Sequence, residues 1–317
     1  MVSRLIAFAK DEGIVEQLLR KENNRKETAL HEAVRLGDDE LVTELLRADG
    51  ALACFPEEGT SPLYLAISLG RVKTAETLLT SDEDISCGGP DGQNALHAAV
   101  LRGPKLTRMV LEWNTNKNVT TKRDISGRTP LHFAASLAKG RPLGQRRAVF
   151  PQVLEANLAA IYQPDNDGLY PVHVAATVGA KHAIELILKN SGGSSAGLRD
   201  AKGRTFLHVA VCNGQVGIIG YACGDRSLAW IMNMQDNDGN TALHLAVEAG
   251  SLRMFSAMVG NRHVNINLAN AERETPLDIA RCKISPGLFY DLKSQEEMIF
   301  RTLFRIGAAW GTYRRGH

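Results

Sequence analysis

Apolar and small residues follow one order along this chain, and that order recurs. Its clearest copy covers residues 239–246 and reads Gly-Asn-Thr-Ala-Leu-His-Leu-Ala. The leucine or valine of this motif occurs eight times, and successive copies lie 33, 33, 35, 41, 35, 36 and 34 residues apart. These anchor positions are Leu30, Leu63, Leu96, Leu131, Val172, Leu207, Leu243 and Leu277. Eight copies in one register indicate an internal repeat.

Each copy predicts a tight turn at the tip of a hairpin, a first helix, a short turn and a second helix. A glycine before the motif permits the turn. A Thr or Ser then caps the first helix, and a Pro such as Pro62 suits its first position. A small residue seven positions after the anchor, such as Gly179, ends that helix. The second helix closes on an apolar pair, as at 45–46 and 78–79. No single repeat can bury these faces, so the repeats are expected to stack.

This pattern predicts one elongated array. Residues 23–290 form the repeats, and residues 1–22 form a partial repeat that holds only a second helix. Residues 291–317 form a capping or linker helix, expected over 295–313. We interpret Met1 as a truncation point or an internal start that earlier repeats once preceded. The alternative is that residues 1–20 fold over as an ordinary N-terminal cap.

Composition narrows the classes of function. The 37 basic and 35 acidic residues leave a formal charge of +2, which argues against a dedicated nucleic-acid binder. The five scattered cysteines form no Cys-x-x-Cys pair, and reduced thiols in a cytosolic compartment are expected. The chain has neither a signal peptide nor an apolar run of about 18 residues, so the sequence as given is not expected to span a membrane.

Six histidines occupy the motif and are the obvious candidates for chemistry: His31, His97, His132, His173, His208 and His244. With one per repeat, equivalent atoms should lie about 10 Å apart, the spacing of packed layers. Zinc needs its ligands within about 2.3 Å of one metal. Tyr64 and Asp278 replace the histidine in two repeats, which a catalytic role would not tolerate. We therefore expect a structural role, with no catalytic residue, metal or cofactor.

Aspartates before the motif resemble the start of a calcium loop, as at residues 236–239, Asp-Asn-Asp-Gly. An EF-hand also needs Gly at its sixth position and Glu at its twelfth. Counted from Asp236, those positions hold Thr241 and Val247. The aspartates are therefore interpreted as residues of the hairpin tips.

A Thr-Pro-Leu-His-x-Ala core with a period near 33 resembles the ankyrin repeat. The resemblance implies an all-α solenoid of about eight repeats plus the partial N-terminal one, and motif histidines that bond to loop backbone. It also implies that other proteins bind the concave side, which is formed by the hairpin tips and the first helices. The candidate contact residues are those that vary between tips: Arg128, Leu169, Arg204 and Asn240.

Three blocks, residues 165–176, 197–208 and 233–246, look like plant ankyrin proteins of the accelerated-cell-death type. That resemblance implies cytosolic repeats followed by a Pro-Gly-Gly-type domain with several membrane spans, and a role in defence and cell-death signalling. Members are anchored in the plasma membrane with the array facing the cytosol. This sequence departs from the pattern because it lacks the membrane domain.

The fourth repeat carries an insertion over residues 139–147 whose basic residues include Arg141, Arg146 and Arg147. It is interpreted either as a contact for an acidic partner or lipid headgroups, or as a solvated loop. For the whole chain, we expect a non-enzymatic protein-interaction scaffold with no small-molecule ligand. One alternative is the targeting arm of an enzyme whose catalytic domain lies elsewhere. Another is an architectural module of a membrane receptor.

Overall fold

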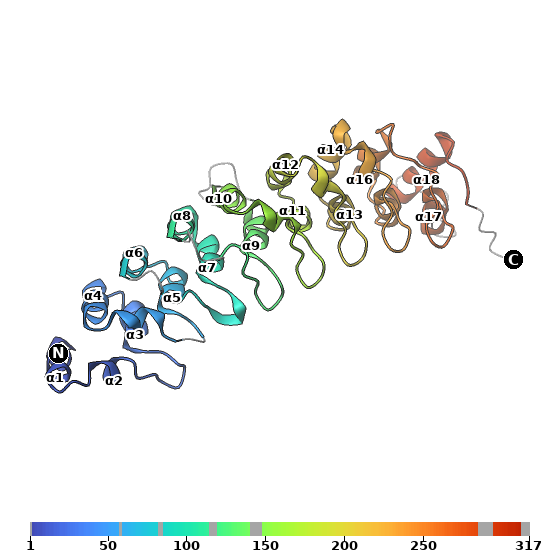
Figure 1. Ribbon diagram of the computed structural model, residues 1–317. Helices are drawn as coiled ribbons and strands as arrows, with labels where there is room; N and C mark the ends of the chain where they lie inside the picture. The colour runs from blue at the N-terminus through green and yellow to red at the C-terminus, as the bar shows by residue number, and fades with distance from the viewer. Residues whose placement is uncertain are drawn as a thin grey trace. The chain divides into compact units, whose positions relative to one another are not determined.

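The computed structural model describes residues 2–56, 59–81, 85–113, 119–139, 148–284 and 294–311. Its internal contacts divide the chain into two compact units. Unit 1 comprises residues 1–137 and 142–160, and unit 2 comprises residues 138–141 and 161–317. In each unit the described helices come in antiparallel pairs (Figure 1). The predicted all-α array of helix-turn-helix repeats is thereby confirmed.

Unit 1 contains four complete pairs. The first helices pack against one another in sequence order, and so do the second helices. The first helices are α3 (Ala29–Leu36), α5 (Pro62–Ser68), α7 (Ala95–Arg102) and α9 (Pro130–Leu137). The second helices are α4 (Asp39–Ala48), α6 (Val72–Ser81), α8 (Pro104–Trp113) and α10 (Val149–Ala156).

Unit 2 repeats the arrangement. Its first helices are α11 (Pro171–Val178), α13 (Phe206–Cys212), α15 (Ala242–Glu248) and α17 (Pro276–Lys283). Its second helices are α12 (Lys181–Asn190), α14 (Val216–Gly224), α16 (Leu252–Val259) and α18 (Gln295–Arg305). The eight anchors lie on the first helices of both units, and each is at most 1% exposed. Their burial between neighbouring helices is the interaction that stacks the repeats.

Short 3₁₀ helices follow several second helices and lead into the tips, by which we mean the turns before each first helix. They are η1 (Gly50–Cys54), η4 (Leu158–Tyr162), η5 (Ser194–Gly197) and η6 (Arg226–Ile231); a further one, η2 (Pro90–Gly92), lies within a tip. The expected β-hairpins are reduced to isolated antiparallel bridges in the described residues, at Gly88–Asn94 and Gln235–Thr241. Single backbone bonds, such as Asp165 N–H to the Leu169 carbonyl (2.9 Å), and side-chain bonds hold the tips in place of a β-ladder.

The first described elements are α1 (Val2–Asp11) and α2 (Val15–Leu19). A helix, a short helix and a tip also follow one another at α4, η1 and the tip before α5. The order of elements therefore gives α1 the place of a second helix.

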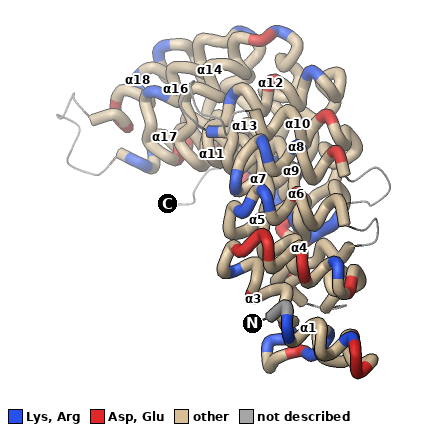
Figure 2. Tube along the Cα trace, turned by 90° about the vertical axis from the view of Figure 1, so that its left-hand side faces the viewer, with Lys and Arg blue, Asp and Glu red and all other residues tan. Residues whose placement is uncertain are grey.

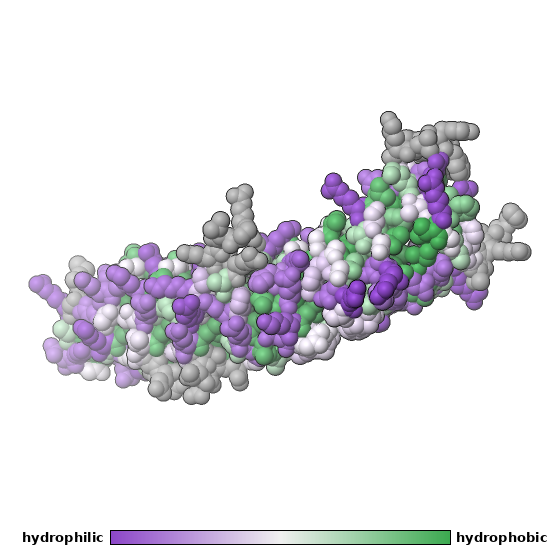
Figure 3. Space-filling model, turned by 90° about the horizontal axis from the view of Figure 1, so that it is seen from above, coloured by the Kyte–Doolittle hydropathy of each residue, from purple (hydrophilic) through white to green (hydrophobic). Residues whose placement is uncertain are grey.

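The C-terminal helix is shorter than the sequence predicts. The expected helix over 295–313 ends at Arg305, because Gly307 adopts a left-handed backbone with φ of 77° and the Ala308 N–H bonds to the Leu303 carbonyl. The chain then returns to the eighth tip, where the Gly311 N–H donates to Asp278 Oδ2 (2.8 Å). Apolar residues gather over the C-terminal elements of unit 2 (Figure 3). They include Phe304, which is 61% exposed.

A positive φ recurs at the tips. Gly203 and Gly239, for example, have φ of 73° and 75°. In the first and eighth repeats Lys26 and Arg273 take the same backbone conformation without being glycine, with φ of 59° and 63°. A side chain in this region costs on the order of 1 kcal/mol.

Candidate functional site

The motif histidines join consecutive repeats through the contacts of their two ring nitrogens. In all six, Nδ1 accepts a hydrogen bond from the backbone N–H three residues earlier, at 3.0–3.2 Å. In five of them, His31, His97, His173, His208 and His244, Nε2 donates to a backbone carbonyl of the following repeat. His173 shows both contacts, since Nδ1 faces the Tyr170 N–H at 3.1 Å and Nε2 faces the carbonyls of Leu198 and Arg204 at 3.1 and 3.0 Å.

These contacts fix the proton on Nε2, because Nδ1 already faces a donor. Burial lowers the pKa of His97 and of His173 to about 4, although each ring also bonds to a carbonyl that favours the charged form. Burial likewise lowers the pKa of His31, His208 and His244. Neutral imidazoles held in this way are poor proton shuttles near pH 7. No group of three or more metal-binding side chains occurs among the residues that the structure describes.

The two repeats without a histidine form a comparable contact with other chemistry. The Tyr64 hydroxyl donates to Gln93 Oε1 of the next tip at 2.8 Å. Asp278 Oδ2 accepts from the Thr275 N–H and hydroxyl at 2.8 and 2.7 Å. Both replacements therefore retain a bond at the start of the first helix or to the following segment.

Six of the tips are closed by one aspartate or asparagine each. Asp165 Oδ1 accepts from the N–H groups of Asp167 and Leu169 at 3.0 and 2.8 Å. The same two bonds, to residues two and four positions later, occur at Asn23, Asp124, Asp200, Asp236 and Asn270. In these tips one side-chain oxygen, from a carboxylate or an amide, accepts hydrogen bonds from the backbone of its own turn.

The residues predicted to contact partners lie in these tips. Arg128 belongs to unit 1, where its guanidinium pairs with Asp124 (Nη2–Oδ2 2.8 Å) and lies 4.9 Å from the Phe133 ring centroid. Leu169 belongs to the first tip of unit 2. Arg204 and Asn240 lie in the next two tips and line one groove. Arg141, Arg146 and Arg147 of the insertion lie outside the described residues.

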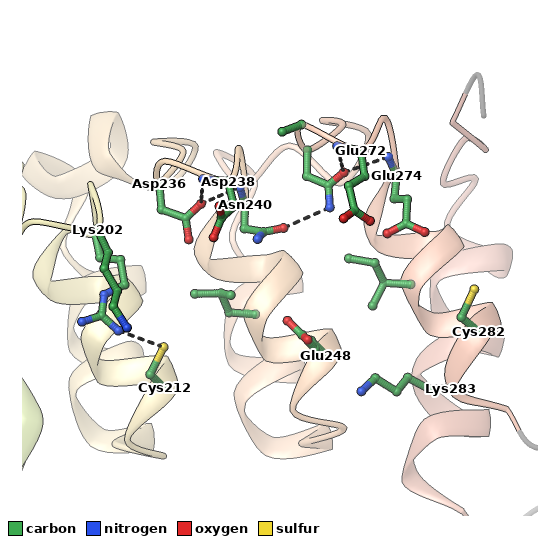
Figure 4. Close-up of a pocket in the computed structure, with 15 residues that line it drawn as sticks. Lys202, Cys212, Asp236, Asp238, Asn240, Glu248, Glu272, Glu274, Cys282 and Lys283 are labelled. Atoms are coloured by element: carbon green, nitrogen blue, oxygen red, sulfur yellow. Dashed lines mark hydrogen bonds between the residues drawn. The ribbon is translucent and has the colours of Figure 1, made fainter.

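We call this cavity the tip groove. It has a volume of about 740 Å³ and opens along the tips and first helices of the last three repeats (Figure 4). Its lining comprises Lys202, Arg204, Cys212, Asp236, Asp238, Asn240, Leu245, Glu248, Asn270, Ala271, Glu272, Glu274, Ile279, Cys282 and Lys283. Five of these are carboxylates. As partner contacts, sequence reasoning named only Arg204 and Asn240 of this set; it interpreted the acidic residues at 236–239 as parts of a hairpin tip.

Charge elsewhere is mixed. Basic and acidic residues are interspersed along the described chain (Figure 2), in keeping with the nearly balanced composition. The described helices include none that is long and apolar enough to cross a membrane.

Known proteins share parts of this sequence. Mouse (Mus musculus) Rabankyrin-5 is 33% identical over 142 residues, a match that spans 45% of this chain and 11% of that protein. The Caenorhabditis elegans poly(ADP-ribose) polymerase tankyrase is 29% identical over 197 residues, which are 57% of this chain and 8% of that protein. This chain therefore spans only about a tenth of the curated relatives it matches.

The fold also has a counterpart among solved structures. The crystal structure of the ankyrin repeat domain of Bcl-3 matches with a TM-score of 0.56 and 23% identity, over 69% of this chain and 93% of that one. A model of three ankyrin repeats matches residues 5–89 and 144–227, and a model of many ankyrin repeats matches residues 225–280. More than half of the sequence is thus matched by a model of this repeat, and the chain belongs to the ankyrin-repeat family.

Proposed function

We propose that this chain is a non-enzymatic scaffold that binds other proteins through the face built from its tips and first helices. The observation that carries the proposal is the backbone contact made by His97, His173, His208 and their equivalents. Each fixes the carbonyl of a tip residue through a bond that does not involve that residue's side chain. Ankyrin repeats are typically protein-interaction modules.

The tips offer different side chains at equivalent places. Arg128, Arg204 and Asn240 all accept a histidine bond through their carbonyls, yet they present two guanidinium groups and one amide. Rigid, regularly spaced elements that carry variable side chains suit recognition of a folded or extended protein surface through distributed contacts. We further propose that residues 23–290 act as the array and that residues 1–22 and 291–317 flank it.

A finer assignment is to plant defence and cell-death signalling, in a protein anchored to the plasma membrane by a further domain. This proposal is supported by the sequence blocks at 165–176, 197–208 and 233–246. It is tested by sequencing full-length transcripts, which are expected to encode a C-terminal segment with several membrane spans. Messages that encode a different C-terminal domain would contradict it.

A second candidate function is the targeting arm of an enzyme. It is favoured by the match to tankyrase, which is named as a poly(ADP-ribose) polymerase. The matched part makes up 8% of that protein. Full-length messages again discriminate, because this function requires a catalytic domain in the same protein or in a tightly bound partner.

The scaffold proposal is tested with two variants of equal charge change. The tip variant adds arginines at exposed tip positions of both units: Ser126→Arg, Asp167→Arg and Asp238→Arg. The control adds them on exposed positions of second helices: Glu112→Arg, Glu155→Arg and Ser256→Arg. Proteins captured by the native chain are identified, purified and titrated by calorimetry against all three forms. The proposal expects binding to be lost in the tip variant and kept in the control, and equal loss in both would contradict it.

A further inference from the structure

We propose that the tip groove binds an extended segment of a partner protein whose central residues are lysine and arginine. This inference rests on the proposed scaffold function and assigns it a site and a partner chemistry. It draws on three properties of the groove, namely four carboxylates that form no salt bridge with a described residue, its partly apolar floor and the positions of its own cations.

Four of the five carboxylates that line the groove bear on what it can bind. Asp236, Asp238, Glu248 and Glu272 form no salt bridge with any residue that the structure describes. Asp238, Glu248 and Glu272 are exposed. They repel one another weakly in water and attract a cationic group that enters between them.

One of the three cations that line the groove is already engaged in an ion pair. The Arg204 guanidinium bonds twice to the buried carboxylate of Asp200, with Nε at 2.8 Å and Nη2 at 2.7 Å from Oδ2. Burial raises the pKa of Asp200, but the bonds from Arg204 lower it by more. The pair therefore remains ionised, and its two charges cancel. Lys202 and Lys283 are the remaining lining cations, and they lie at opposite ends of the groove (Figure 4).

The carboxylates come from three elements that surround the groove. Asp236 and Asp238 belong to one tip, Glu272 to the next tip, and Glu248 to the last turn of α15 (Figure 4). Between them the floor contains the half-buried side chains of Leu245 and Ile279. Lysine and arginine combine a charged head with a long aliphatic stem, so such a side chain can pack its stem on this floor and reach the carboxylates.

The positions of the two lysines define the charge pattern of the partner. A segment that is basic throughout would place cations against Lys202 or Lys283. A segment with a basic centre and uncharged or acidic ends meets carboxylates in the middle and ammonium groups at the ends. This order of charges also selects one placement along the groove, because a shift would bring like charges together.

The test uses a labelled peptide with a central Lys-Arg-Lys-Arg run and Ser and Glu at both ends. In a second, charge-exchanged peptide, Glu replaces each Lys and Arg, and Lys replaces each Glu. Binding to the full chain is followed by fluorescence anisotropy at about 0.05 M and about 0.3 M salt. We expect saturable binding of the first peptide only, weaker at the higher salt because exposed charges are screened.

The groove variant carries Asp238→Asn, Glu248→Gln and Glu272→Gln, exchanges that keep size and remove charge. The matched control, Glu40→Gln, Glu112→Gln and Glu155→Gln, removes three exposed carboxylates from second helices. We expect the groove variant to bind the basic peptide about tenfold more weakly and the control to bind it as the native chain does. Equal weakening in both variants, or binding of only the charge-exchanged peptide, would overturn the inference.

A reversal provides an independent readout. The variant Asp238→Lys, Glu272→Lys should gain binding to the charge-exchanged peptide, and absence of that gain in a folded variant counts against the groove as the site. Failure here is separable from failure of the scaffold proposal. If a captured protein binds the native chain, is lost in the tip variant and yet is unaffected in the groove variant, the scaffold proposal holds and this inference fails.

Discussion

Acidification from about pH 7.5 to about pH 5 should destabilise both units, because His97 of unit 1 and His173 of unit 2 are held in their neutral form. Their pKa values fall from 6.5 to about 4 on folding. As the pH drops below 6.5 the unfolded chain therefore takes up these protons before the folded chain does. The stability contributed by the neutral rings is complete above about pH 6.5 and is lost progressively toward pH 4.

The magnitude follows from the pKa difference. One pKa unit corresponds to about 1.4 kcal/mol, so each ring contributes up to roughly 3.4 kcal/mol, of which roughly 2 kcal/mol is lost by about pH 5. The rings of His31, His208 and His244 act in the same direction. The lowered pKa of Asp200 adds its own loss only at lower pH, below the ordinary range of a carboxylate.

The assay is the free energy of unfolding from urea titrations between about pH 7.5 and about pH 5, together with the NMR titration of the ring signals. His173→Asn keeps an acceptor for the Tyr170 N–H but cannot titrate. It should cost about 1–3 kcal/mol near neutral pH through the unpaired carbonyls, and its deficit relative to the native chain should shrink toward pH 5. Ile184→Val, a non-titrating core change in α12, should show a constant deficit. If the His173 ring titrates near pH 6.5, or if stability does not change with pH, the reasoning is wrong.

Three further outcomes concern the tips and are measured by the same denaturation. Gly239→Ala should cost about 2–4 kcal/mol, because its Cβ would lie 2.5 Å from the Ala271 nitrogen, whereas Gly214→Ala should cost only the backbone strain of about 1–2 kcal/mol, since nothing lies within 4 Å; equal costs would contradict the close approach of neighbouring tips. Asp165→Ala should lose about 1–2 kcal/mol with its two backbone bonds, and Asp165→Asn should be nearly neutral, unless the charge itself matters. Arg273→Gly should raise stability by about 0.5 kcal/mol by relieving its left-handed backbone, and a loss would show that its side chain contributes to packing.

The repeat architecture could be predicted from the sequence because its signals are local. The motif specifies one helix and its ends wherever it occurs. It consists of an anchor such as Leu131, a capping residue such as Thr129 and a glycine at a fixed distance. The end of the last helix was misjudged for a local reason as well. The apolar spacing continues past Arg305, but Gly307 allows the left-handed turn that terminates α18.

The tip groove was only partly accessible to prediction because it depends on stacking. Glu248 ends one helix and Glu272 lies in the following tip, and no spacing rule shows that both face the same cavity as Lys202. Variation between tips singled out Arg204 and Asn240, which line the groove in the structure, and their role as partner contacts stays a prediction. It did not show that Arg204 is engaged by Asp200, which requires the side-chain geometry.

The histidine contact also bears on how such a chain can evolve. The bond ends on a peptide carbonyl, which every amino acid possesses, and the residues that supply it are Thr60, Arg128, Arg204, Asn240 and Glu274. The histidine bond therefore does not depend on the side chain at these positions. Substitutions can change the exposed side chains of one tip at a time while the fold is retained. Duplication can add a whole repeat that makes the same histidine bond to its neighbour.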